Sequence, residues 1–129
     1  VLFPVVSPAL MNGPRALRTV QDLANRTLFC EHAGSWMRWL AEASADKLEG
    51  LRILEIGIAH VGIEAAVRGQ GVALGDSFSA RDDLADGTLV RPFRITVPAK
   101  HAYYWVRRHE LKEAPLVAAF VSWVDSKLA

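Results

Sequence analysis

This 129-residue chain lacks several features that would each point to a class of protein. Cys30 is its only cysteine, so no disulfide can form within the chain. No apolar run approaches the roughly 20 residues that a membrane-spanning helix needs. The 15 Lys and Arg residues nearly balance the 14 Asp and Glu residues, and this net charge of +1 argues against a strong attraction to nucleic acid. Internal repeats, low-complexity tracts and flexible linkers are also missing.

Apolar residues, in contrast, make up 51% of the chain. A length of 129 residues suits one compact domain with a real core. Because no segment is long enough to span a bilayer, the apolar residues must lie in a core or a protein interface. Trp36, Trp39 and Trp123 stand at helical spacing, and we expect them in such a core or interface rather than on a base-stacking platform.

Short apolar runs alternate along the chain with segments of helical periodicity. Thr19 with Asp22 resembles a capping box, Ser79 with Asp82 repeats that signal, and Ser35 is expected to cap the helix that follows it. We expect strands at 2–7, 27–30, 51–58, 72–74, 90–97 and 102–106, and helices at 20–24, 36–43, 60–68, 79–87 and 115–128. This alternation predicts an α/β fold with a mostly parallel sheet.

Two adjoining motifs carry a resemblance to a known family. They read A-A-x-x-G-x-G-V-A-L-G over residues 65–75 and D-L-A-x-G-x-L-V-R-P-F over residues 83–93. Together they resemble the effector-binding domain of LysR-type transcriptional regulators, especially the subgroup named for the activator of the glycine-cleavage operon. Weaker matches in the same order are F-P-V-V-S-P-A-L at 3–10, L-R-T-x-x-D-L-A at 17–24, W-x-x-W-L at 36–40, A-Y-Y-W-V at 102–106 and P-x-V-x-A-F-x-x-W at 115–123.

The resemblance implies a fold like that of a periplasmic binding protein, with two α/β subdomains joined by two crossover strands. Residues 1–93 would form the second subdomain with its incoming crossover, and residues 94–129 the return crossover and C-terminal helix of an incomplete first subdomain. The chain is thus expected to begin partway through the domain. No segment resembles a recognition helix, so we expect no specific DNA contact by this chain alone.

The resemblance also suggests where a ligand binds. The turn at Ile58, Ala59, His60 and Val61 leads from a strand into a helix, and a helix N-terminus suits a carboxylate. Family members usually carry Ser, Asp or Thr there. The alternative for His60 is a role as a surface helix cap.

Two aromatic residues are further predicted ligand contacts. Tyr104 lies on the return crossover, at a position that lines the cleft in the family, and Phe93 lies near that crossover. For both, ordinary packing in a core is the alternative.

Two other segments resemble sites of different chemistry. Gly75-Asp76-Ser77-Phe78-Ser79 resembles the nucleophile block of the SGNH hydrolases, but the D-x-x-H pair of that family is absent. Cys30-Glu31-His32 offers two side chains on one face of a strand, too few for a metal site.

We therefore predict a non-enzymatic, cytoplasmic sensor of a small effector such as an amino acid or carboxylate, with no cofactor and no membrane contact. The apolar stripe of the final helix would lack its family partner, which predicts a homodimer; an exchange of C-terminal elements between the copies is one form that it could take. One alternative is a stand-alone ligand-binding or protein-interaction module derived from such a domain. A less favoured alternative is an esterase that uses Ser77.

Overall fold

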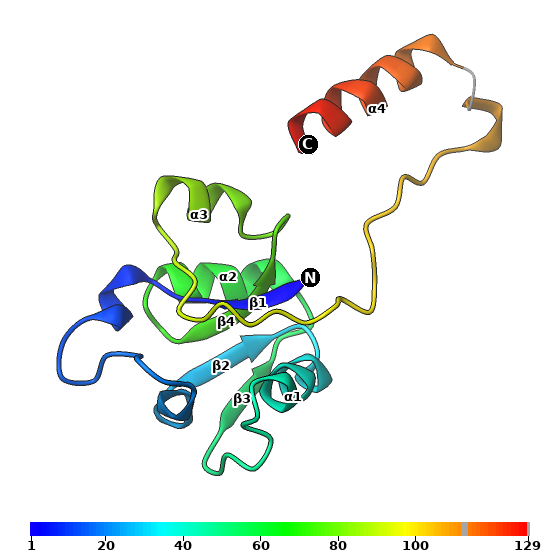
Figure 1. Ribbon diagram of the computed structural model, residues 1–129. Coiled ribbons are helices and arrows are strands. Elements are labelled where there is room, and N and C mark those ends of the chain that lie inside the picture. Colours follow the sequence, from blue (N-terminus) through cyan, green and yellow to red (C-terminus); the bar gives the residue numbers. More distant parts are fainter. Residues whose placement is uncertain (112–113, 129) are drawn as a thin grey trace. The chain divides into compact units, whose positions relative to one another are not determined.

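Four strands form a single mixed sheet in the first part of the molecule (Figure 1). The strands are β1 (Leu2–Val5), β2 (Thr27–Cys30), β3 (Arg52–Glu55) and β4 (Val72–Asp76), in the spatial order β1-β4-β2-β3. Strand β2 pairs in parallel with both β3 and β4, whereas β1 is antiparallel to β4. The predicted α/β fold with a mostly parallel sheet is therefore confirmed.

This computed structural model describes residues 1–111 and 114–128. The chain divides into two compact units, Val1–Ala99 and Lys100–Ala129. The first unit carries the sheet, the helices α1 (Ala33–Glu42), α2 (Ala59–Val67) and α3 (Arg81–Asp86), and the 3-10 turns η1 (Pro8–Met11) and η2 (Val20–Asn25). The predicted capping box of Thr19 and Asp22 is present at the start of η2.

The two longer helices of this unit cover opposite faces of the sheet (Figure 1). Helix α1 packs with β2 and β3, and α2 packs with β2 and β4. Alternate residues of each strand follow this division, because successive side chains on a strand point to opposite faces. On β2, Leu28 and Cys30 join the cluster that holds Trp36 and Trp39 of α1, whereas Phe29 joins the cluster of α2.

Strands β2 and β4 approach closely beside Gly71, the residue that precedes β4. A Cβ atom at this position would lie 2.2 Å from the carbonyl oxygen of Thr27 and 2.8 Å from Cε2 of Phe29. Both distances are far inside van der Waals contact, so the packing at the start of β4 requires glycine.

The return segment of residues 91–99 is not the strand that the sequence predicted. Only Val90 and Val97 form isolated bridges, to Val6 and Leu2 respectively. Side chains of α1 hold the rest of the segment: the Trp39 indole N–H donates to the Ile95 carbonyl at 3.0 Å. Pro92 lacks the backbone N–H that a strand residue would donate. A side-chain donor of α1 bonds the Ile95 carbonyl, which in a strand would accept from a neighbouring strand.

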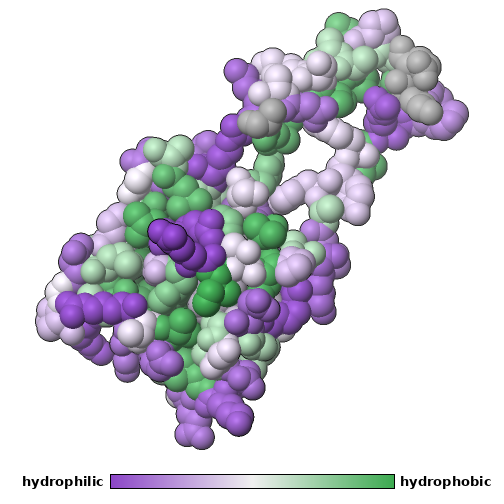
Figure 2. Space-filling model, viewed as in Figure 1, coloured by the Kyte–Doolittle hydropathy of each residue, from purple (hydrophilic) through white to green (hydrophobic). Residues whose placement is uncertain are grey.

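The second unit contains an extended segment, the turn η3 (His109–Leu111) and the helix α4 (Pro115–Leu128). The predicted final helix is confirmed, whereas the predicted strand over residues 102–106 has no regular structure. The Trp105 ring lies against Phe120, whose ring is next to that of Trp123, with centroids 6.1 Å apart in each pair. Apolar residues remain visible on the surface of α4 (Figure 2).

Within the residues that the structure describes, no helix is long and apolar enough to cross a membrane.

Candidate functional site

Three parallel strands, β2, β3 and β4, end at the same edge of the sheet. The loops beyond them run in different directions, because β2 leads to α1 on one face while β3 leads to α2 on the other. In open α/β sheets, ligands bind outside the carboxyl ends of the strands where neighbouring connections diverge in this way. The predicted residues Ile58 to Val61 stand at this edge.

The turn from β3 into α2 presents an uncapped helix N-terminus. Ile58 occupies the N-cap position in an extended conformation, and no side chain caps the helix there. The Val61 N–H bonds back to the Ile58 carbonyl at 3.2 Å, which closes the first turn. Ile58 and Val61 are 60% and 45% exposed, so the apolar side chains of the first turn of α2 are accessible to solvent.

His60 lies on the outer side of this turn. Its side chain is 75% exposed, and Nε2 lies 3.8 Å from Oε1 of Glu64, one helical turn along. His60 also influences Asp83 of α3: the pKa of that carboxyl is raised chiefly by desolvation, then by neighbouring carboxylates including Asp86, while His60 acts in the opposite direction. The imidazole therefore lies close to the Glu64 carboxylate, on the outer side of the first turn of α2.

The start of α1, at the same edge, is already occupied by a carboxylate. Oε2 of Glu55, the last residue of β3, accepts the Ala33 N–H at 2.7 Å. Nδ1 of His32 lies 3.9 Å from the other oxygen of Glu55. The sequence-based prediction that Ser35 caps this helix was wrong, because α1 begins at Ala33. No local motif reveals the cap from Glu55, since it comes from a neighbouring strand.

The hydrolase-like block at the end of β4 has a structural explanation. Oδ1 of Asp76 accepts the N–H groups of Phe78 and Ser79 at 2.7 and 2.8 Å, and the Ser79 hydroxyl accepts the Asp76 N–H at 3.1 Å. A Cβ atom at Gly75 would lie 2.9 Å from Cδ1 of Ile63, so a larger residue here would displace the end of that side chain. These hydrogen bonds within the block form the turn that connects β4 to α3.

The predicted cap from Ser79 was also wrong, because α3 has Ala80 at its N-cap. Gly87, in the left-handed conformation, does end α3 as predicted.

Cys30 is unsuited to metal binding or nucleophilic chemistry. Burial, followed by the nearby charge of Glu55, raises the pKa of its thiol to about 11, so the thiol stays protonated. Across residues 1–111 and 114–128, no three His, Cys, Asp or Glu side chains group so as to hold a metal ion.

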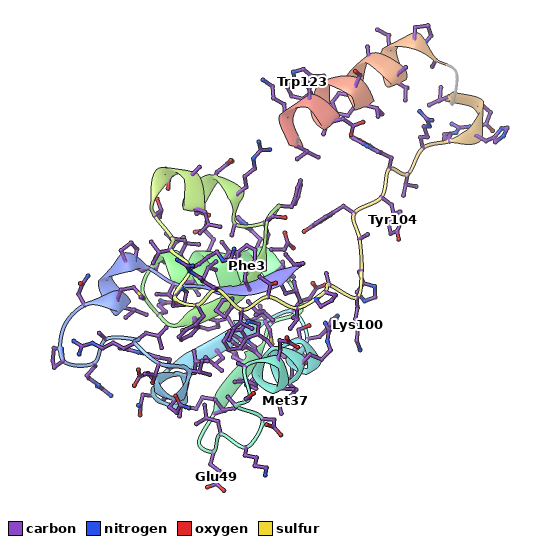
Figure 3. The ribbon with its side chains drawn as sticks, in the orientation of Figure 1. Phe3, Met37, Glu49, Lys100, Tyr104 and Trp123 are labelled. Carbon is purple, nitrogen blue, oxygen red and sulfur yellow. The ribbon has the colours of Figure 1, made fainter. Side chains whose placement is uncertain are left out.

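The remaining predicted site residues lie elsewhere. The ring of Phe93 packs against Trp39, with centroids 5.6 Å apart, in the cluster on the α1 face. Helix α2 covers the opposite face, so the structure does not bring Phe93 to the first turn of α2. Tyr104 belongs to the second unit, on the extended segment that follows Lys100, and is 81% exposed (Figure 3).

A depression of about 220 Å³ in the first unit contains none of the predicted site residues. It is lined by Pro14, Arg15, Ala16, Asp22 and Asn25.

Comparison with known proteins decides the family. The LysR substrate binding domain matches the chain over residues 1–129. The chain belongs to the LysR substrate-binding domain family. A similar relative is the glycine cleavage system transcriptional activator of Escherichia coli (strain K12), which is 34% identical over 131 residues. That alignment covers 99% of this chain and 42% of the relative, so the chain spans less than half the length of the curated relatives it matches.

Solved structures agree with this assignment at the level of the fold. The AmpR effector binding domain from Citrobacter freundii has a TM-score of 0.75 at 22% identity, covering 98% of this chain and 62% of that chain. The effector domain of AmpR from Pseudomonas aeruginosa has a TM-score of 0.69 at 24% identity, covering 98% of this chain and 61% of that chain. The predicted fold class, a periplasmic-binding-protein-like α/β fold, is confirmed.

Proposed function

We propose that this chain senses a small carboxylate or amino acid on behalf of a transcriptional regulator, and that the first turn of α2 contacts the effector. Membership of the LysR substrate-binding domain family supports the role in sensing, as does the likeness to a transcriptional activator. The proposed role involves no catalysis, and we place it in the cytoplasm, where such a regulator meets both metabolites and DNA.

The observation that carries the proposal is a difference between two helix starts at one sheet edge. Helix α1 has its Ala33 N–H bonded to Glu55, whereas α2 begins without a side-chain cap. An uncapped N-terminus offers backbone N–H donors and a partial positive charge of about half a unit. The effector carboxylate would accept from the backbone of Ala59 and His60, while Ile58 and Val61 contact its apolar part.

The two aromatic residues have different roles in this proposal. Phe93 packs on Trp39, so its proposed part is to hold the beginning of the return segment rather than to contact the effector. Tyr104 remains a predicted ligand contact that rests on the family resemblance alone.

The division of the chain is also part of the proposal. We assign residues 1–93 to the second effector-binding subdomain with its incoming crossover, and residues 94–129 to the return crossover and C-terminal helix of the first subdomain. The exposed apolar side chains of α4 support this assignment, because a helix of a complete subdomain would bury them. They include Leu116, Phe120 and Trp123, which are 86%, 56% and 57% exposed.

The same exposed side chains support a homodimer, in which α4 of each copy would be covered by the other. Size-exclusion chromatography with light scattering over a concentration series measures this. A stable dimer is expected, and a monomer that persists at about 50 µM would contradict it.

A charge substitution tests the ligand site. A panel of amino acids and small carboxylates is first screened for a rise in melting temperature, and the best binder is measured by calorimetry. Ala59→Glu places a carboxylate at the first residue of α2, where it should lower the affinity for a carboxylate about tenfold. The same change should stabilise the free chain by up to about 1 kcal/mol, because acidic residues favour helix starts.

The matched control is Gln70→Glu, which adds the same charge just beyond the other end of α2. Its affinity should equal that of the unmodified chain. Equal affinity in Ala59→Glu, or an equal loss in both variants, would place the effector elsewhere.

A further inference from the structure

Helix α1 holds the return segment by two side-chain hydrogen bonds to backbone carbonyls. The Trp39 indole N–H donates to Ile95 at 3.0 Å, and Nη1 of Arg38 donates to Pro98 at 2.9 Å. Apart from the bridge of Val97 to Leu2, residues 91–99 form no regular structure. The path of this segment therefore depends on α1 as much as on the sheet.

The two hydrogen bonds differ in how deeply their donor side chains are buried. Trp39 is fully buried, and its ring packs on Trp36 and Phe93, so its bond to Ile95 belongs to the core. Arg38 is only partly buried and sits one residue earlier, next to the last carbonyls before the second unit begins at Lys100. Figure 3 marks Lys100 where the chain leaves the first unit.

The contact made by Arg38 carries an internal cost. Its Nε atom is shielded from solvent and has no hydrogen-bond partner among the residues that the structure describes. A buried donor without an acceptor loses its hydration without compensation, which offsets part of the charge-assisted bond to Pro98. The unpaired Nε therefore lowers the net stabilisation that Arg38 gives to this contact.

The N-terminal end of α1 lies at the candidate ligand edge. There Glu55 holds the Ala33 N–H, and its carboxylate lies beside His32. Arg38 follows Ala33 by about one and a half turns of this ten-residue helix, so a displacement of the helix start would be carried to Arg38 if the helix moved as a unit.

We propose that Arg38 is a positioning residue that sets the path by which the chain leaves Val1–Ala99, so that a movement of α1 is passed to the residues beyond Pro98. Its use in the response to an effector rests on the proposed function. The experiment below needs no effector, so the two proposals can fail separately.

Limited trypsin digestion of the full chain measures how firmly the segment is held. Cleavage after Lys100 requires the residues around it, Pro98 included, to leave their path and enter the protease. Cleavage after Arg107, in the exposed part of the second unit, provides an internal reference. Arg38→Met keeps the aliphatic stem but removes the donors, and it should raise the ratio of Lys100 to Arg107 cleavage about tenfold.

Two further variants complete the test. Arg38→Lys retains one charged donor and should give an intermediate ratio, while Arg52→Met makes the same change on the exposed strand β3 and should give the original ratio. An unchanged ratio in Arg38→Met, or an equal rise in Arg52→Met, would overturn the proposal. If Arg38→Met does not fold, as judged by circular dichroism, the comparison between Arg38→Lys and Arg52→Met decides: an unchanged ratio in Arg38→Lys would then overturn it.

Discussion

Each of the two units of this chain contains a helix with large apolar side chains, but only the first unit buries them. In Val1–Ala99, Trp36 and Trp39 of α1 are completely buried against the sheet. In Lys100–Ala129, α4 also carries large apolar residues at helical spacing, yet Trp123 is 57% exposed and none of the described residues of that unit is buried. An apolar stripe therefore becomes a core only where a second layer of structure faces it.

The largest expected effect tests that comparison directly. Trp39→Ala leaves a cavity and an unpaired Ile95 carbonyl, and it should destabilise the first unit by about 3–5 kcal/mol. Trp123→Ala should change the free energy of unfolding by less than about 0.5 kcal/mol, because its ring is already half in water. Urea denaturation at low protein concentration, where a dimer is dissociated, measures both. Similar losses in the two variants would show that α4 is packed within its own chain.

A smaller effect distinguishes a tightly packed glycine from an open one within Val1–Ala99. Gly71→Ala places a Cβ against the backbone of Thr27 and should cost about 1–3 kcal/mol. Gly34→Ala, in α1, meets nothing within 4 Å and should be neutral or stabilising by up to about 1 kcal/mol. Thermal melts of the two variants distinguish tight from open positions. A tolerated alanine at Gly71 would mean that β2 and β4 can move apart.

The smallest expected effect concerns charge. The pKa of Asp22 is lowered from 3.8, first by the Thr19 N–H and then by that of Arg18. A lowered carboxyl pKa stabilises the fold above 3.8, and that stability is lost as the pH falls through the folded value. Asp22→Asn should therefore destabilise at neutral pH, and the difference should vanish in acid.

The pKa of Asp83 is shifted in the opposite direction to that of Asp22. Desolvation, followed by Asp86 and other carboxylates, raises its pKa above 3.8, so its ionisation opposes folding as the pH rises through the folded value. Asp83→Asn should stabilise the chain slightly at neutral pH and have no effect in acid. Denaturation curves at neutral pH and in acid below the folded-state pKa of each carboxyl check both variants. Equal shifts at the two pH values would indicate a packing effect instead of an electrostatic one.

Local signals predicted much of the fold. Strand β2 and helix α4 lie where apolar runs and periodicity placed them, and Gly87 ends α3. The predicted strands over 90–97 and 102–106 were wrong: the first forms only isolated bridges to Val6 and Leu2, and the second pairs with no strand among the described residues. The Trp39 indole N–H donates to Ile95 within the first of these segments, and Arg38 donates to Pro98 just after it.

The candidate site was predictable to a lesser degree. The pattern of strand followed by helix placed Ile58 to Val61 at a helix start, and the structure has α2 begin there. The capping of α1 by Glu55 at the same edge was not predictable, since Glu55 lies 22 residues from the Ala33 N–H that it binds. Phe93 is close to the return segment in sequence, but its ring packs on the face of the sheet opposite α2.

The sequence by itself determined the family, the order of the elements and the apolar stripes, because these depend on residue type and on spacing along the chain. Only the tertiary structure decided which stripes are covered, which carboxylate caps α1 and what holds the return segment. Each of these depends on groups that are far apart in sequence and meet only when the sheet forms, as Glu55 meets Ala33 and Arg38 meets Pro98.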